Sequence, residues 1–424
     1  MTTPASTIEE LTAQRDQARQ DHAALAERGL KLDLTRGKPS PHQLDLSDEL
    51  LDVQRPLVSA DGTDLRNYGG LQGLPELREI FSAALQVPAE QLLAAGNSSL
   101  ELMHDALAFA LLGVLPGGER RWVDEPEIAF LCPVPGYDRH FGVCERLGVT
   151  MIPVPMTAEG PDMDVVERLV EDPKVKGIWC VPKYSNPDGT VYSDETVRRL
   201  AAMTTAAPDF RIFWDNAYAV HHLTDEPAEI ADLLALCAEH GNQDRAFVFG
   251  STSKITFAGG GVGFFGSSPA NVEWWLGRTA KRSIGPDKIN QLRHVRFLRD
   301  AEGLREHMRR HAALVRPKFD AVDKILSAEL GGTGLATWTS PEGGYFISLQ
   351  VPEGCARAVV AKAKEVGIAL TPAGASHPYG DDPEDRLIRI APTFPELPEL
   401  ETAITGLTTC VRLVAAEKLL ADAS

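Results

Sequence analysis

The sequence lacks the patterns that mark several large classes of protein. None of its 424 residues falls in an apolar run near the roughly 18 residues that a membrane helix requires. Its start, MTTPASTIEELTAQRDQ, has no basic segment followed by an apolar one, so we expect no secretory signal. None of the six cysteines forms a C-x-x-C pair, which argues against a zinc ribbon or a thioredoxin motif. These absences predict a cytoplasmic protein with reduced cysteines, no membrane segment and no metal site.

Positive charge is also scarce. Lysine and arginine total 42 against 60 acidic residues, which gives a formal net charge of −18. Such a surface argues against binding along a nucleic-acid backbone, although it leaves room for a small basic pocket. The hydrophobic content of 43% is ample for a large core, and the length suggests two or three domains.

The order of the expected elements indicates an α/β protein. Helices are expected over residues 7–29, 74–85 and 100–112. Beyond them, short apolar runs typical of buried strands alternate with helical stretches such as 165–170 and 194–206. The strands are expected in EIAFLCPVP, VTMIPVP, VKGIWCVP, FRIFWDN and RAFVFGS. This alternation predicts a mainly parallel sheet with helices on both faces.

The character of the chain changes near residue 291. A charged helix with an interruption is expected over 290–319, then a helix over 322–330, then strands in GGYFISLQV and RLIRIAP. We therefore predict a large domain over 49–290 and a smaller α+β domain over 291–424. An N-terminal helix and arm over 1–48 would pack with the smaller domain.

Polar residues follow three of the predicted strands. Asn186 follows VKGIWCVP, Asp215 ends FRIFWDN with Tyr218 three residues on, and Lys254 follows RAFVFGS. Because ligands of α/β sheets bind at the carboxyl ends of the strands, we expect these side chains to converge on one pocket. Taken singly, each has an ordinary explanation, as a helix cap, a core tyrosine, a surface lysine or an Asn-Pro-Asp-Gly turn.

Further motifs occur in a fixed order with these residues. They are Tyr68 with Gly73 five residues later, Asn97-Ser98-Ser99, Pro135-Gly136-Tyr137, Asn186-Pro187-Asp188-Gly189, Asp215-x-x-Tyr218, Ser251-x-Ser253-Lys254, and Arg389 in RLIRIAP. In this order, and over nearly the whole chain, they resemble the class I/II aminotransferases of pyridoxal-phosphate (PLP) fold type I. The segments TRGKPSP, GNSSLELM, VPKYSNPDGT and GPDKINQLRHVRFL are most similar to a bacterial, MocR-like subgroup of aspartate aminotransferases.

The resemblance implies a chemical role for the strand-end residues. Lys254 would carry PLP as a Schiff base and would then act as the base at the substrate Cα. Asp215, supported by His140, would keep the pyridine nitrogen protonated. Tyr218 and Asn186 would hydrogen-bond the ring hydroxyl.

The resemblance also implies how cofactor and substrate are held. The cofactor phosphate would be bound by the hydroxyls of Ser98, Ser99, Ser251 and Ser253, and by the N–H groups of a helix that begins at Ser99. Tyr137 would stack on the pyridine ring. Tyr68 would reach the phosphate of the neighbouring subunit, which implies a homodimer. The substrate would be bound by Arg389, at its α-carboxylate, with Gly37 and Asn186.

The chain departs from the family pattern at one position. The family places an arginine for the phosphate eight residues after the lysine, where this chain has Val262. Arg36, Lys281 and Arg282 are the candidate replacements. For a second, distal substrate carboxylate the candidates are Arg36, Lys38 and Arg282.

Two patterns are interpreted as unrelated to function. Residues 258–263, AGGGVG, lack the Gly-x-Gly-x-x-Gly spacing and follow a lysine turn, so we do not expect nucleotide binding. His307 and His311 have the spacing of metal ligands on a helix, but no acidic third ligand is evident. We expect them on a charged surface helix.

Three functions are open at this point. The first is an aminotransferase that acts on aspartate or glutamate with 2-oxoglutarate or oxaloacetate. The second is an aminotransferase for another amino acid, such as alanine with glyoxylate or an aromatic acid, or a different PLP enzyme of fold type I. The third is a MocR-type transcription regulator, which we do not expect because only about 30 residues precede the cofactor domain, too few for a winged helix.

Overall fold

The computed structural model describes residues 8–52 and 55–423, and its centre is an eight-stranded sheet. The strand order is β2-β9-β8-β7-β6-β3-β4-β5. The strands are β2 (Leu92–Ala95), β3 (Ala129–Val134), β4 (Thr150–Thr157), β5 (Gly160–Pro161), β6 (Val175–Cys180), β7 (Arg211–Asp215), β8 (Ala246–Ser251) and β9 (Gly263–Gly266). From β8 to β4 each strand is parallel to its neighbour, whereas β9 is antiparallel to β8 and β2. The predicted α/β class is confirmed, and all five predicted strands are present.

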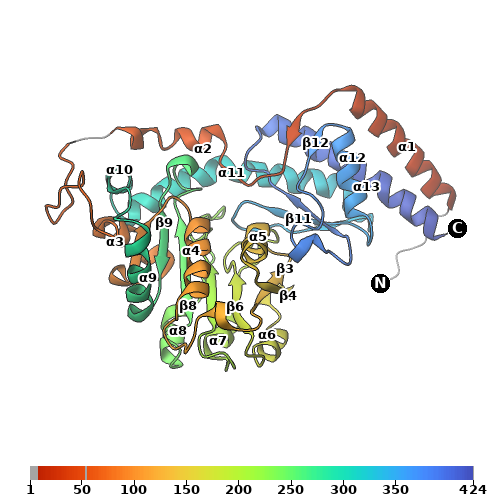
Figure 1. Cartoon of the computed structure of the whole chain (residues 1–424). Helices are drawn as coiled ribbons and strands as arrows, with labels where there is room; N and C mark the ends of the chain where they lie inside the picture. The colour runs from red at the N-terminus through yellow and green to blue at the C-terminus, as the bar shows by residue number, and fades with distance from the viewer. Residues whose placement is uncertain (1–7, 53–54, 424) are drawn as a thin grey trace.

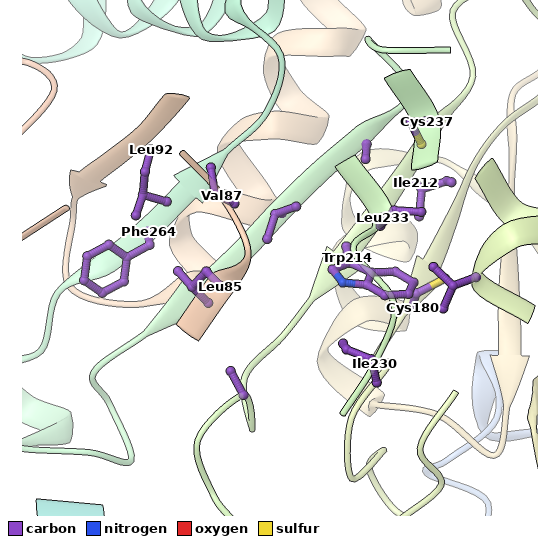
Figure 2. Packing of buried hydrophobic residues seen from close by; sticks show 14 of the residues in the cluster. Leu85, Val87, Leu92, Cys180, Ile212, Trp214, Ile230, Leu233, Cys237 and Phe264 are labelled. Atoms are coloured by element: carbon purple, nitrogen blue, oxygen red, sulfur yellow. The ribbon is translucent and has the colours of Figure 1, made fainter. Parts of the chain in front are cut away.

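The central strands are apolar on both faces because both faces are covered. In β7, Ile212 and Trp214 belong to one buried cluster, and Phe213 between them belongs to another. In β9, Phe264 belongs to the same cluster as Ile212 and Trp214, and Phe265 belongs to the cluster of Phe213. Figure 2 shows part of the first cluster, in which residues of several strands meet helix residues. With both faces closed by apolar packing, polar groups on these strands are concentrated at the strand ends.

Seven α-helices and four short 3-10 helices lie within the described residues from 48 to 282. They are η1 (Asp48–Leu51), α3 (Pro75–Leu85), η2 (Ala89–Gln91), α4 (Ser99–Leu112), η3 (Trp122–Asp124), α5 (Asp138–Leu147), α6 (Met163–Leu169), α7 (Asp194–Ala202), α8 (Leu233–Glu239), η4 (Ala258–Gly260) and α9 (Pro269–Arg282). Helix α7 ends four residues earlier than predicted. Arg245 explains the early end, because its guanidinium donates to the carbonyls of Ala201 and Met203 and satisfies the last turn.

The C-terminal part forms a second, smaller α+β unit that takes in the N-terminal segment. Its elements are α1 (Ile8–Glu27), β1 (Leu32–Asp33), α2 (Pro41–Asp45), the second half of α11 (Ala301–Leu330), β10 (Thr337–Trp338), β11 (Ile347–Gln350), α12 (Ala356–Glu365), β12 (Ile368–Ala369), η5 (Pro378–Gly380), β13 (Leu387–Ile390) and α13 (Leu397–Asp422). Helix α10 (Lys288–Leu298) instead packs on the large unit, where Leu292 and Leu298 join its core. β10, β11 and β13 form an antiparallel sheet, and β1 pairs in parallel with β12. Figure 1 shows α1 lying along α13, where Arg19 pairs with Glu417.

The long helix α11 corrects the sequence prediction, which had a break between residues 319 and 322. It runs unbroken through Pro317, because Val315, Phe319, Val322 and Leu326 bury one continuous face of it. Its first half packs elsewhere, since Leu304 and Met308 belong to the core of the large sheet. The predicted domain boundary at 290/291 stays a prediction, and from this packing we propose a boundary inside α11.

The histidine pair on α11 is a second correction. His307 and His311 were expected on an exposed helix face, but each is only 3% exposed. Both point into the protein, and their Nε2 atoms lie 3.1 Å apart. The helix is amphipathic, and these histidines lie on its buried side. No cluster of three or more His, Cys, Asp or Glu residues that could hold a metal occurs in the part of the chain that is described.

Two further sequence expectations concern membranes and cysteines. No helix among residues 8–52 and 55–423 is long and apolar enough to cross a membrane. The six cysteines are all buried and unpaired. The expectation that there is no secretory signal rests partly on the first seven residues, which lie outside the described residues.

An arm that includes residues 55–74 is held to the large sheet by α10. Lys288 Nζ donates to the carbonyls of Asn67 and Gly69, at 2.8 and 2.6 Å. Gln291 accepts from the Leu74 N–H and donates to the Ala94 carbonyl. Gly73 ends the arm at a φ of +76°, and a Cβ there would lie 2.3 Å from the Ala94 carbonyl oxygen. Only glycine allows this close approach.

We expect Gly73→Ala to lower the free energy of unfolding by about 2–4 kcal/mol, because it adds a backbone clash to the cost of a left-handed backbone. Gly29→Ala is the matched control. Gly29 also has a positive φ, +60°, but a Cβ there would meet nothing within 4 Å. The control should lose only about 1 kcal/mol. Urea unfolding followed by circular dichroism measures both, and equal losses would contradict the packing described here.

Candidate active site

The residues predicted to converge lie together at the carboxyl edge of β6, β7 and β8. Asp215 is the last residue of β7, and Lys254 follows the end of β8 by three residues. Lys254 Nζ lies 5.0 Å from the centre of the Tyr218 ring. Asn186 follows β6 and is 3% exposed. The carboxyl edge of these strands therefore carries an amine, a carboxylate, a phenol and an amide.

The carboxylate of Asp215 is held from one side only. Its Oδ2 lies 3.0 Å from His140 Nε2, and both side chains are almost fully buried. His140 is itself stacked on Trp179, with ring centres 4.4 Å apart. Asp215 Oδ1 is buried without a hydrogen-bond partner among the described residues. A buried carboxylate oxygen is costly without a donor, so this oxygen is suited to a donor on a bound molecule.

Lys254 lies in an aromatic and apolar surrounding. Tyr218 and Tyr345 face its Nζ, with ring centres 5.0 and 5.9 Å away. Burial lowers the pKa of Lys254, and the charge of Asp215 partly opposes that shift. Burial also raises the pKa of Tyr218 well above its ordinary value, which keeps the phenol protonated. A lysine with a lowered pKa has more of the neutral amine that acts as a nucleophile or a base.

The main chain of Lys254 is fixed by residues that the sequence reasoning missed. His221 Nε2 and the Tyr345 hydroxyl each lie 3.3 Å from the Lys254 carbonyl oxygen. Burial and the nearby Lys254 lower the pKa of His221, so it stays neutral and donates from Nε2. His221 stands three residues after Tyr218, and nothing in that spacing distinguishes it from a packing residue.

This hydrogen bonding continues into the N-terminal segment and α11. Gln43 Nε2 donates to the Tyr345 hydroxyl at 3.0 Å and lies 3.2 Å from His311 Nδ1. His311 contacts His307, whose Nε2 lies 2.7 Å from the Ile255 carbonyl. This chain of hydrogen-bonded side chains therefore begins at the Lys254 carbonyl and ends at the carbonyl of the next residue, Ile255.

The start of α4 lies beside the Gly-rich segment that follows Lys254. Ser98 is the N-cap, and its Oγ accepts from the Glu101 N–H. A Cβ on Gly261 or Gly263 would lie 2.8 Å from the carbonyl oxygens of Asn97 and Ser98 respectively. Asn290 holds the segment in place by donating to the Gly260 and Gly261 carbonyls. The glycines thus allow close packing against the carbonyls that precede α4. The N–H groups of the first turn of α4 suit an anion.

Val262 stands at the position where the family pattern has an arginine for the phosphate, and the candidate cations that could replace that arginine differ in their surroundings. Val262 is buried, and its N–H donates to Thr252 Oγ1. Arg282 already pairs with Glu101 at 2.5 Å and with Asp105 at 2.8 Å. Lys281 and Arg36 are exposed. Ser251 Oγ accepts from the Ser253 N–H, on the turn that carries Lys254.

Arg389 reaches the pocket from β13 of the smaller unit. It is 8% exposed, and its guanidinium lies over the Phe346 ring at 4.9 Å. It donates to Asn186 Oδ1 at 3.2 Å, to Thr371 Oγ1 at 3.1 Å and to Asp138 Oδ1 at 3.1 Å. Gly37 packs against the tip of the Phe346 ring, where a Cβ would lie 2.4 Å from Cζ.

The two tyrosines predicted to contact the cofactor differ in exposure. Tyr137 precedes α5, and its ring lies edge-on to His140 at 4.9 Å. Tyr68 is 81% exposed and lies on the arm between the two carbonyls that Lys288 binds. Within this chain Tyr68 does not join the other site residues. Lys288 lies in the segment GPDKINQLRHVRFL, but its contact with the arm could not be seen from sequence.

Comparison with known proteins identifies the family of this chain. The sequence profile described as "Aspartate amino-transferase" matches residues 6–423. The chain belongs to this family. It is 52% identical over 395 residues to "Aspartate aminotransferase" of Corynebacterium glutamicum, covering 93% of this chain and 91% of that protein. A crystal structure of an aspartate transaminase from C. glutamicum superposes with a TM-score of 0.95 at 48% identity, covering 98% of this chain and all of the other.

A more distant neighbour shares the fold. The α-aminoadipate aminotransferase LysN of Thermus thermophilus shares the fold at 20% identity and a TM-score of 0.74, with 97% of each chain covered. It was crystallised with N-(5'-phosphopyridoxyl)-L-leucine. As a member of the family matched over residues 6–423, the present chain is an aminotransferase that uses PLP, and its substrates are amino acids and 2-oxo acids. The unpartnered Asp215 oxygen fits a protonated pyridine nitrogen, and the start of α4 fits a phosphate.

The burial of His311 leads to a prediction about the stability of the folded protein at acid pH. Burial, with His307 nearby, lowers the pKa of His311 from 6.5 to about 3. The folded state therefore favours neutral His311, and this stability is fully present above pH 6.5 and is lost as the pH falls. Between pH 8 and pH 5 the loss should be about 2 kcal/mol in the free energy of unfolding.

His311→Gln should remove that part of the pH dependence, because glutamine keeps a hydrogen-bond partner for Gln43 but does not titrate. His240→Gln, at an exposed histidine, is the control and should keep the wild-type dependence. Urea unfolding at the two pH values measures both. An unchanged dependence in His311→Gln would show that this histidine is not held neutral.

Proposed function

We propose that this enzyme moves an amino group between L-aspartate or L-glutamate and 2-oxoglutarate or oxaloacetate. The observation that carries the proposal is the buried Arg389, which faces Asn186 across the domain interface and offers a guanidinium for the α-carboxylate. The named relative from C. glutamicum supports aspartate as the amino donor. The similarity to this relative extends over nearly the whole of both chains.

In this proposal the pocket residues divide the work of proton transfer. The cofactor, when bound, supplies an electron sink for the negative charge that forms at the substrate Cα. Lys254 Nζ would hold the cofactor and then move the proton at Cα, a role supported by its lowered pKa. Asp215 would hold a proton on the ring nitrogen through its free Oδ1, with His140 positioning the carboxylate. Tyr218 would donate a hydrogen bond to the ring hydroxyl and so orient the ring.

The remaining site residues would bind and position. The phosphate would be held by Ser98, Ser99, Ser251 and Ser253 with the first turn of α4. Tyr137 would cover the ring. Asn186 and Arg389, with Gly37 making room for the Phe346 ring beneath Arg389, would orient the substrate carboxylate. For a distal carboxylate Arg36 and Lys38 remain candidates, whereas Arg282 is already paired with Glu101 and Asp105.

We also propose that the active unit is a homodimer in which Tyr68 completes the partner's site. Tyr68 is 81% exposed on an arm that Lys288 holds rigidly, so the ring is presented to another molecule. Leu51 and Ile284 are 60% and 64% exposed. Large apolar side chains so exposed are typical of surfaces that another subunit covers.

Aspartate should react faster than alanine in single-turnover half-reactions of the PLP-loaded enzyme, followed by the cofactor absorbance. A second charge-assisted contact contributes about 1.5–3 kcal/mol, or roughly 10- to 150-fold in specificity. Lys254→Ala should lose nearly all turnover, whereas Lys324→Ala, at an exposed lysine, should not. Equal rates for aspartate, alanine and phenylalanine would reject the aspartate assignment. A fully active Lys254→Ala would reject the catalytic site.

Mixing two inactive variants tests the shared site. In a hybrid of Lys254→Ala with Tyr68→Ala, one of the two sites receives an intact Lys254 and an intact Tyr68. Random pairing should therefore restore about a quarter of wild-type activity. The control is Lys254→Ala mixed with Asp215→Ala, whose defects lie in the same chain's site, so no activity should return. Absence of recovery in the first mixture, when Tyr68→Ala alone is inactive, would contradict the shared site.

A further inference from the structure

The arginine proposed for the substrate carboxylate is already bound to a carboxylate of its own chain. Arg389 Nη1 lies 3.1 Å from Asp138 Oδ1. Its other two partners, Asn186 Oδ1 and Thr371 Oγ1, are neutral. Asp138 is the one acidic residue that forms an ion pair with Arg389 within residues 8–52 and 55–423. The internal pair thus occupies one end of the guanidinium that a substrate would need.

Asp138 is placed where it can leave Arg389 without breaking the fold. It is the first residue of α5, directly after Tyr137, and its side chain is 34% exposed. Arg389, in contrast, is 8% exposed and is tied down by Asn186, Thr371 and the face of Phe346. When the pair separates, the carboxylate can therefore turn to solvent at the helix N-terminus, where negative charge is favourable. The arginine stays in position.

A substrate carboxylate binds a guanidinium best through two parallel hydrogen bonds. Arg389 Nε is buried without a partner, and Nη1 is shared between Asp138 and Asn186. A second carboxylate at this fork would be repelled by Asp138 and would compete with it for Nη1. Binding of any α-carboxylate therefore includes the cost of displacing Asp138.

We propose that Asp138 is a displaceable internal carboxylate that holds Arg389 ready between turnovers and sets the affinity of the enzyme for its substrates. This inference rests on the proposed role of Arg389. Asp138 is a positioning residue, because it acts through Arg389. It weakens all α-carboxylate ligands by the same factor, since each must displace it, and it does not distinguish aspartate from alanine.

The test uses the PLP-loaded enzyme and its variant Asp138→Asn, which keeps the size and one hydrogen-bond acceptor but removes the charge. The probes are succinate and propionate, unreactive carboxylates, titrated as inhibitors, together with steady-state kinetics for aspartate and alanine. We expect the inhibition constants and both KM values to fall about tenfold, the difference between a charge-assisted and a neutral hydrogen bond. Because the substrate displaces Asp138 before it reacts, binding is strengthened equally in the ground state and the transition state, so kcat should not change.

Two further variants separate the possible outcomes. Asp194→Asn removes the acid at the same first position of helix α7, and it controls for the loss of a helix-end charge. Asp138→Ser provides a second charge-free variant if the asparagine variant folds poorly. Arg389→Lys should weaken both inhibitors in the wild-type background.

Unchanged or weaker carboxylate binding in both Asp138 variants, with binding lost in Arg389→Lys, would overturn the role of Asp138 and leave the proposed function intact. A tighter affinity for succinate alone would also overturn it, because Asp138 would then repel the distal carboxylate and not compete at Arg389. If Arg389→Lys binds both inhibitors as the wild type does, the proposed role of Arg389 fails and the inference falls with it.

Discussion

The carboxyl edge of β6, β7 and β8 is the constraint on which the rest of the site depends. These strands are apolar on both faces because helices and clusters of aromatic residues cover both faces. A charged group on them can be accommodated only where the strands end. Asp215 lies at that limit, with one oxygen on His140 and the other without a partner in the described chain. A buried acceptor of this kind is stable only beside a donor, and we propose that the protonated cofactor ring supplies it.

Lys254 is held by a network that reaches beyond the large sheet. Its carbonyl is bound by His221 and Tyr345, and Tyr345 is bound by Gln43 of the N-terminal segment. Gln43 also contacts His311 on α11, the helix whose first half packs on the large core and whose second half packs on the small one. Three segments far apart in sequence therefore support the turn that carries Lys254. The buried histidines serve this support as neutral hydrogen-bonding groups, for which their lowered pKa values are suited.

Arg389 joins the two units of the chain at the pocket. It comes from β13 of the small sheet and binds Asn186 and Asp138 of the large domain. Substrate binding at this residue would exchange an internal ion pair for an external one. If the substrate binds Arg389 as proposed, the position of the small unit would depend on the occupancy of the site, because the same guanidinium makes both contacts.

Local pattern in the sequence determined the α/β class, the strands of the sheet, and the polar residues at the strand ends, Asp215, Asn186 and Lys254. These features depend on burial and on short spacing, which composition and periodicity record directly. Tertiary structure decided the unbroken α11 through Pro317, the burial of His307 and His311, and the ends of α7. It also decided the contacts of Gln43 with Tyr345, of Lys288 with the Tyr68 arm, and of Asp138 with Arg389. Each of these contacts joins residues separated by more than 200 positions, and their energies arise only once packing has brought the segments together, so no local pattern records them.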